Sequence, residues 1–179
     1  MIRRINFFGG PGVGKSTLAS RLFTMWSQLG HSATLIPEIV KQLVYARTPP
    51  QGWDYTLTFA QQLYAEYTPL NYGVQRIVTD SPLLLQVIYA QHHGCTVANP
   101  LARICDQFEE EYPSVNFLIE RHFPFQTEGR FQATEGEAIE MDGIIEALMK
   151  CYCIPYTRIN PNITDLQLGT IMYEIEHQE

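Results

Sequence analysis

The feature that most constrains the fold is a glycine-rich segment at residues 9–16, with the pattern Gly-x4-Gly-Lys-Ser. A short apolar stretch, residues 5–8, runs directly into it, and apolar side chains recur at helical spacing over residues 18–29. The order strand, glycine loop, helix is the context in which this pattern forms a phosphate-binding loop. The segment therefore predicts a parallel α/β fold with a nucleotide site.

The loop is suited to the phosphates of ATP. Its glycines allow backbone N–H groups to approach a phosphate closely. Lys15 supplies a positive charge over the β- and γ-phosphates, and the hydroxyl of Ser16 can ligate magnesium. We therefore predict ATP and Mg²⁺ as cofactors. The residues expected to bind the nucleotide are Gly10, Gly12, Val13, Gly14, Lys15, Ser16, Thr17 and, from further along the chain, Arg121.

The rest of the chain alternates strand and helix patterns. Further strands are predicted at residues 32–36, 76–80, 115–119 and 156–159. Helices are predicted at residues 39–46, 55–67, 83–91, 100–111 and 136–150 and from about 165 onward, and Pro69 is expected to end the second of them. This alternation predicts a P-loop NTPase fold, a doubly wound, mostly parallel five-stranded sheet with helices on both faces. At 179 residues, we expect one domain covering residues 1–179.

Two carboxylates follow predicted strands. Glu38 comes just after residues 32–36, and Asp80 ends residues 76–80. Ligands gather at the carboxyl ends of strands in an open α/β sheet, so both should lie near the loop. Asp80 would hold magnesium together with Ser16, and either carboxylate could accept a proton from an attacking hydroxyl. The alternative is a role at a helix start, as a cap for Asp80 and as a dipole partner for Glu38.

Arginines are scarce in this acidic chain, and two of them bracket a glycine-containing stretch after the fourth predicted strand. We expect residues 121–135 to form a lid that excludes water from ATP. In it, Arg130 would be catalytic by offsetting charge on the transferred phosphate, and Arg121 would contact the nucleotide. Solvated surface positions are the alternative for both. Asp142, on the next helix, could pair with a lid arginine or face water.

Aromatic and amide side chains are mixed in residues 53–67. Stacking faces and a bidentate amide can hold a flat heterocycle, which makes Trp53, Phe59 and Gln62 candidates for binding an acceptor beside Glu38 and Asp80. An aromatic stripe at helical spacing is also typical of a hydrophobic core, so that interpretation stays open.

Composition limits the function classes. The net charge of −7 and a pI near 5.2 argue against a broad basic face for binding long nucleic acid. The four cysteines lack paired CxxC spacing, and no secretory signal pattern is present, so reduced thiols and a cytoplasmic location are expected. No apolar run approaches the roughly 20 residues that span a bilayer, which predicts no membrane association.

Several segments together resemble a known family. They are the loop at residues 9–16, Pro37-Glu38, the glutamine-bearing helix 55–67, residues 78–84 (Val-Thr-Asp-Ser-Pro-Leu-Leu) and residues 129–138 (Gly-Arg-x-Gln-x4-Glu-Ala). The chain resembles, over residues 5–159, small AAA-like P-loop kinases that include ribosylnicotinamide kinases and bacteriophage 5-hydroxymethyluridine DNA kinases. The resemblance implies ATP and Mg²⁺ at Gly14, Lys15 and Ser16, a catalytic carboxylate at Glu38 or Asp80, and a lid arginine at Arg130.

The similarity to the phage kinases implies a specific acceptor. Size and the segments 79–84 and 129–132 favour phosphorylation of the hydroxymethyl group of 5-hydroxymethyluracil in DNA, in the host cytoplasm if a phage encodes the chain. The acidic charge argues against DNA, although capture of one flipped base needs only a small positive lip. The alternative is a kinase for a free nucleoside or nucleotide, of the ribosylnicotinamide or deoxynucleoside type.

A third class, an NTPase switch that phosphorylates nothing, is disfavoured. The sequence has no Asn-Lys-x-Asp guanine motif, and it is short for a motor with a helical lid domain. Monomer and homodimer are both left open by the sequence.

Overall fold

A single parallel sheet organises the molecule. The computed structural model describes residues 4–46, 48–126 and 134–177. In chain order the strands are β1 (Arg4–Phe8), β2 (Ala33–Ile36), β3 (Arg76–Thr79), β4 (Ser114–Ile119) and β5 (Thr157–Ile159). They lie in the order β2-β3-β1-β4-β5, and every neighbouring pair is parallel. The predicted five-stranded α/β fold is therefore confirmed.

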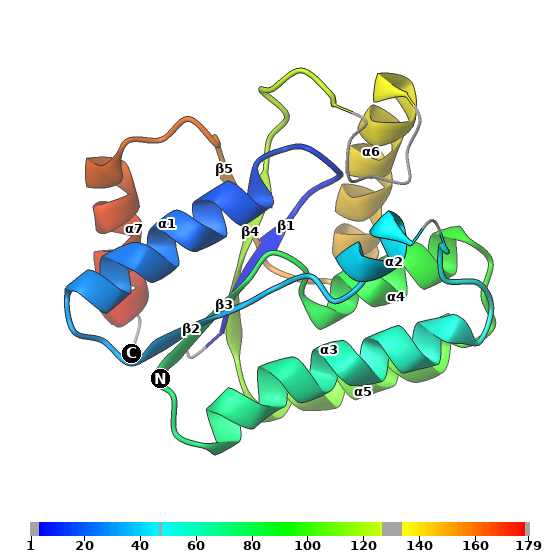
Figure 1. Cartoon of the computed structure of the whole chain (residues 1–179), viewed down its shortest axis with the longest axis horizontal. Coiled ribbons are helices and arrows are strands. Elements are labelled where there is room, and N and C mark those ends of the chain that lie inside the picture. Colours follow the sequence, from blue (N-terminus) through cyan, green and yellow to red (C-terminus); the bar gives the residue numbers. More distant parts are fainter. Residues whose placement is uncertain (1–3, 47, 127–133, 178–179) are drawn as a thin grey trace.

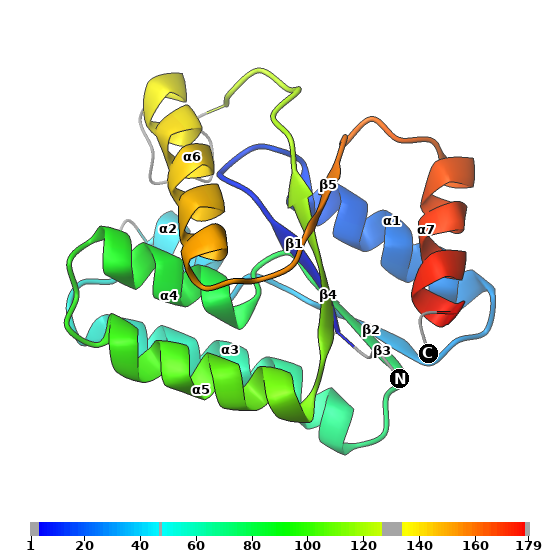
Figure 2. The same ribbon diagram turned by 180° about the vertical axis from the view of Figure 1, so that it is seen from behind.

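Helices cover both faces of this sheet (Figures 1 and 2). The helices are α1 (Lys15–Gln28), α2 (Lys41–Tyr45), α3 (Asp54–Asn71), α4 (Leu83–His92), α5 (Ala98–Glu111), α6 (Glu135–Cys151) and α7 (Asp165–His177). Helices α1 and α7 lie on one face, and α3, α4, α5 and α6 lie on the other. No helix in the described ranges is long and apolar enough to cross a membrane.

Alternation along the strands builds a separate core on each face. Ile5 and Phe7 of β1 pack with α1 and α7, whereas Phe8 packs with the helices of the other face. In β4, Phe117 and Leu118 divide in the same way. Strands buried on both faces are what a parallel sheet with helical crossovers requires.

Helix α3 continues past the proline that was expected to end it. The prediction was wrong because Pro69 lies in the last turn, where a proline removes only one hydrogen bond to the residue four positions earlier. The helix continues past Pro69 because Leu70 is only 2% exposed and packs in the core. The turn then closes with bonds from Tyr72 N to Thr68 O at 3.0 Å and from Val74 N to Pro69 O at 2.9 Å.

A buried charged cluster lies at the amino end of the sheet, away from the glycine loop. Arg4 starts β1, and its Nη2 lies 3.0 Å from Oε2 of Glu66 on α3, with both side chains almost fully buried. Arg4 Nη1 donates to Glu109 Oε2 at 2.8 Å, and Gln62 Nε2 donates to Glu66 Oε1 at 3.2 Å. These mutual bonds satisfy charges that would otherwise be costly to bury.

Candidate active site

The glycine loop connects β1 to α1 at the carboxyl edge of the sheet. Its last glycine, Gly14, has a φ of 100°, a left-handed conformation that glycine adopts without strain. A Cβ at this position would also lie 3.2 Å from both Phe123 and Pro161. Glycine is therefore required here for conformation and for space.

Lys15 is held inside the loop. Its Nζ donates to Gly9 O at 2.7 Å and to Gly10 O at 2.8 Å. Burial lowers the pKa of Lys15, while the carboxylates of Glu38, Asp80 and Asp142 act to raise it. The ammonium thus lies among three acidic groups that favour its charged form.

Ser16 and Asp80, the two predicted magnesium ligands, are joined by a hydrogen bond. Ser16 Oγ donates a short hydrogen bond to Oδ2 of Asp80, which follows β3 and is 8% exposed. The other oxygen, Oδ1, is buried without a hydrogen-bond partner in the described part of the chain. A hydroxyl beside a carboxylate with a free oxygen is a donor set that fits Mg²⁺, which usually binds one or two carboxylates plus phosphate oxygens.

Within the described ranges, no group of three or more His, Cys, Asp and Glu side chains gathers into a metal cage. The four cysteines, all described, are free thiols. The structure therefore offers oxygen ligands at Ser16 and Asp80, where the nucleotide phosphates would supply the rest.

Glu38 follows β2 and lies partly buried beside the loop. Burial raises the pKa of its carboxyl; Asp80 adds to the rise and Lys15 opposes it. A carboxylate with a raised pKa is a stronger proton acceptor once it is ionised. Glu38 thus places a carboxyl of raised pKa at the cavity beside the loop.

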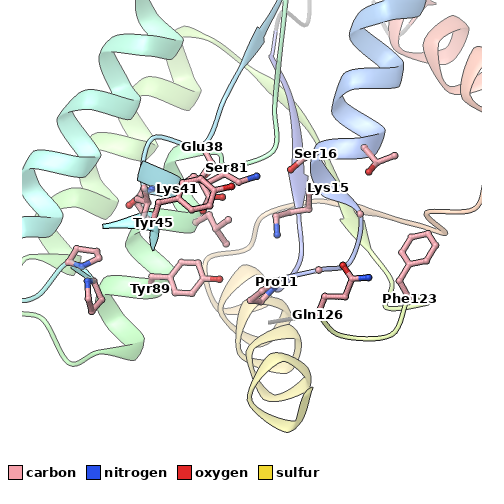
Figure 3. A pocket seen from close by; sticks show the side chains of 18 of the residues that line it. Pro11, Lys15, Ser16, Glu38, Lys41, Tyr45, Ser81, Tyr89, Phe123 and Gln126 are labelled. Carbon is pink, nitrogen blue, oxygen red and sulfur yellow. The ribbon is translucent and has the colours of Figure 1, made fainter. Parts of the chain in front are cut away.

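One cavity of about 790 Å³ joins the loop to a second group of side chains (Figure 3). We call one side the loop wall, which comprises Pro11, Gly12, Gly14, Lys15, Ser16 and Thr17. The acceptor wall comprises Glu38, Val40, Lys41, Tyr45, Pro49, Pro50, Tyr55, Ser81, Leu85, Gln86, Tyr89 and His93. Figure 3 shows Tyr45 and Tyr89 across the cavity from Lys15. Phe123, Pro124 and Gln126, from the segment after β4, complete the lining.

One face of α4 supplies much of the acceptor wall. Leu85, Tyr89 and His93 recur at a spacing of four residues, which places them on the same side of the helix. Tyr55 of α3 joins this face, because its hydroxyl lies 2.5 Å from Nδ1 of His93. Desolvation and the neighbouring His92 lower the pKa of His93, and burial raises that of Tyr55. Both shifts favour the uncharged forms of the two side chains.

Arg121 and Asp142 meet behind the loop. Arg121 Nε donates to Asp142 Oδ2 at 2.6 Å, and Gly10 N donates to Asp142 Oδ1 at 2.8 Å. Arg121 also donates to Pro11 O at 2.9 Å. Of the two interpretations of Asp142, the structure supports pairing with an arginine. Arg121 is not among the residues that line the cavity.

The structure brings together only part of the predicted nucleotide site. Lining residues include Gly12, Gly14, Lys15, Ser16 and Thr17. The backbone N–H of Gly10 is bonded to Asp142, and the side chain of Val13 is fully buried in the core under α1. Arg130 lies outside the described residues, as does the stretch 127–133 of the expected lid at 121–135.

The predicted acceptor residues on α3 and just before it are not brought to the cavity. Phe59 is 2% exposed and belongs to the core, and Gln62 is fully buried against Glu66. Trp53 is 75% exposed, and it does not line the cavity. The reason is the orientation of α3, which turns this stripe toward the sheet and toward solvent. Asp80 also lies outside the lining, although its hydrogen-bond partner Ser16 lines the cavity.

The acceptor wall holds residues that the sequence analysis did not identify, chiefly Lys41, Tyr45, Tyr55, Gln86, Tyr89 and His93. Only Tyr55 lay within the aromatic segment that had attracted attention. Gln86, Tyr89 and His93 gave no signal because α4 is apolar nearly all round and its residues 83–88 are all buried. A helix of this kind does not show which face borders a cavity.

Comparisons with known proteins identify the fold and the family. A search of curated proteins finds no significant match to the sequence. Among solved structures, a thymidylate kinase from Ehrlichia chaffeensis is similar, with a TM-score of 0.67, 13% identity and coverage of 97% of this chain and 98% of that one. That likeness shows the P-loop NTPase fold. The sequence matches the family described as AAA domain over residues 4–166, and the chain therefore belongs to this AAA-domain family.

Proposed function

We propose that the chain is an ATP-dependent kinase that transfers the γ-phosphate to a hydroxyl of a nucleoside-like acceptor. The observation that carries this proposal is the single cavity shared by the loop wall and the acceptor wall. A volume of about 790 Å³ lies within the range of roughly 300–1,000 Å³ that small-molecule sites occupy. A switch that only hydrolyses its nucleotide has no need for a second lined space beside the phosphates.

The two walls divide the work of transfer. Backbone N–H groups of the loop and the Lys15 ammonium would bind the phosphates and offset the charge that develops during transfer. Glu38 is the proposed base: it would take the proton of the acceptor hydroxyl while the oxygen forms a bond to the γ-phosphorus. The bond from that phosphorus to the bridging oxygen breaks, and ADP leaves. Asp80 is less suited to be the base because it is paired with Ser16.

The cofactor is proposed to be ATP with magnesium held through Ser16 and Asp80, for which the partnerless Oδ1 of Asp80 supplies a ligand. Bound magnesium would neutralise phosphate charge. Arg121 does not line the cavity, and it is proposed to serve nucleotide binding through the loop, because its Nη2 donates to Pro11 O at 2.9 Å.

The acceptor wall suits a planar ring. Tyr45, Tyr55 and Tyr89 offer aromatic surface, and Gln86 offers an amide. Among the lining residues that the structure describes, the cations are Lys15 and Lys41, and none is arginine. A DNA strand is normally held by several phosphate contacts, so this lining favours a free nucleoside or nucleotide.

The second candidate acceptor is 5-hydroxymethyluracil within DNA. It remains a candidate because Lys41 is exposed at the cavity and could bind one backbone phosphate. Both candidates use the same ATP chemistry and differ only in what carries the hydroxyl.

A transfer assay with γ-labelled ATP and magnesium distinguishes the two candidate acceptors. It would offer, in parallel, thymidine, 5-hydroxymethyldeoxyuridine, ribosylnicotinamide, duplex DNA containing 5-hydroxymethyluracil, and unmodified DNA. We expect label in a free nucleoside. Label in the modified DNA alone would move the acceptor to DNA, and ATP hydrolysis with label in none of them would overturn the kinase proposal.

A further inference from the structure

Asp142 links helix α6 to the start of the glycine loop. Its Oδ1 accepts from Gly10 N at 2.8 Å and from Arg121 Nη2 at 3.1 Å, and its Oδ2 accepts from Arg121 Nε at 2.6 Å. One carboxylate therefore receives three hydrogen bonds from two segments that are far apart in the sequence. Its charge and that of Arg121 strengthen these bonds.

The bond to Gly10 N fixes a peptide unit whose other end holds Lys15. There are no cis peptide bonds in the described chain, so the N–H and C=O of each peptide unit point in opposite directions. In the unit between Gly9 and Gly10, the N–H faces Asp142 and the carbonyl accepts from Lys15 Nζ at 2.7 Å. The carboxylate is thereby connected to the phosphate-binding lysine through one planar group.

Arg121 orients the next part of the loop in the same manner. Its Nη2 donates to Pro11 O at 2.9 Å. Because that carbonyl faces Arg121, the N–H of Gly12, in the same peptide unit, points away from the arginine. Gly12 lines the cavity, so its N–H is on the side suited to a phosphate oxygen.

The contact leaves room only for an aspartate at position 142 and a glycine at position 10. A Cβ on Gly10 would lie 2.3 Å from Oδ1 of Asp142 and 3.0 Å from Ala138 O. Glutamate at position 142 would be one methylene too long for this gap. Asparagine would keep one acceptor oxygen but would turn an N–H₂ donor toward either Gly10 N or Arg121, which are themselves donors.

We propose that Asp142 is a positioning residue for nucleotide binding, which sets Lys15 and the loop N–H groups through Gly10 and Arg121 without touching the nucleotide. The inference rests on the proposed binding of ATP. It concerns the affinity for ATP and needs no particular acceptor.

The test measures the affinity of the full chain for a non-hydrolysable ATP analogue with magnesium by calorimetry, alongside thermal unfolding. Asp142→Asn is expected to weaken binding roughly tenfold to a hundredfold, the range for lost hydrogen bonds to a charged group. The matched control is Glu140→Gln, the same loss of charge two residues earlier on α6 at an exposed position, and it should bind like the parent.

A second variant keeps the test decisive if Asp142→Asn unfolds. Arg121→Lys retains the positive charge but cannot reach both Asp142 oxygens and Pro11 O with one planar fork. It should also weaken binding. Where Asp142→Asn folds, the double variant should bind no more weakly than the worse single variant, since both act through one connection.

The outcomes separate this inference from the kinase proposal. Parent-like analogue affinity in Asp142→Asn, or a lower melting temperature with unchanged affinity, would overturn the positioning role while leaving the kinase proposal intact. Failure to find any phosphorylated acceptor would overturn the kinase proposal and leave the binding test valid. A parent chain that binds no ATP analogue would overturn both.

Discussion

The loop wall of the cavity comes from one continuous segment, residues 11–17, whereas the acceptor wall draws on α2, α3, α4 and the turns between them. The loop wall borders the cavity with glycine backbone and with the side chains of Lys15, Ser16 and Thr17. In the acceptor wall, side chains of many types line the cavity. The packing of α2, α3 and α4 against one another decides which of them reach it. We infer that the loop wall carries the chemistry common to every acceptor and that the acceptor wall decides which molecule is phosphorylated. This difference can be tested by comparing variants of the two walls.

The largest effect is expected from Lys15→Ala in the loop wall. Loss of the ammonium removes charge compensation for the transferred phosphate, and we expect kcat/KM to fall about 1,000-fold or more with every acceptor. Steady-state kinetics with two different acceptors would measure it. The control is Lys150→Ala, an exposed lysine on α6, which should be near normal. Near-parental transfer by Lys15→Ala to one of the two acceptors would contradict the proposed division of roles between the walls.

A smaller effect is expected from Glu38→Gln, at the border of the two walls. Removing the proposed base should lower kcat about 100-fold while ATP binding is retained. Because burial raises the pKa of Glu38, the base is lost as pH falls through a value above the usual 4.5. The acid limb of the parent's pH–rate profile should therefore lie at a higher pH than an ordinary carboxylate would give. This limb should vanish in the variant.

The same raised pKa has a consequence for stability. The folded chain holds the Glu38 proton more tightly than the unfolded chain, so this group's contribution to the free energy of unfolding falls as pH rises from about 4.5 through the raised pKa. At neutral pH, Glu38→Gln should therefore unfold at the same temperature as the parent or a higher one. A large drop in melting temperature would make Glu38 a structural residue.

A still smaller effect is expected from Tyr89→Ala in the acceptor wall. Loss of one aromatic face should raise KM for the acceptor about tenfold and leave KM for ATP unchanged. Tyr89→Phe separates the ring from the hydroxyl, and Tyr64→Ala is the control, because Tyr64 is 70% exposed and lies away from the cavity. Equal rises in both KM values would show that the two walls do not act separately.

The contrast between the walls also explains what the sequence could predict. The loop is a local pattern in which order and spacing specify backbone geometry, so Lys15 and Ser16 could be placed before the structure was known. The strand alternation predicted the sheet, and Glu38 and Asp80 followed from the rule that ligands collect at the carboxyl ends of strands. Each of these inferences depends on residues that are neighbours in the chain.

The acceptor wall depends on the rotation of helices about their own axes. Phe59 and Gln62 occupy the side of α3 that faces the core, and only the position of α3 against α4 reveals that Tyr55 reaches His93 instead. The contact between Gly10 and Asp142 joins residues 132 positions apart. No periodic pattern in a single sequence contains such a pairing, so these parts of the site required the structure.

The smallest effect is expected from Trp53→Ala, which tests the sequence-based acceptor site directly. Trp53 is 75% exposed just before α3 and does not line the cavity. An exposed side chain away from the site usually changes a free energy by about 0.5 kcal/mol or less, so KM for both substrates should stay within about twofold of the parent. The measurement is the pair of KM values used for Tyr89→Ala. A tenfold rise in the acceptor KM would mean that Trp53 closes over the acceptor in the bound state, and the acceptor wall would then have to include the start of α3.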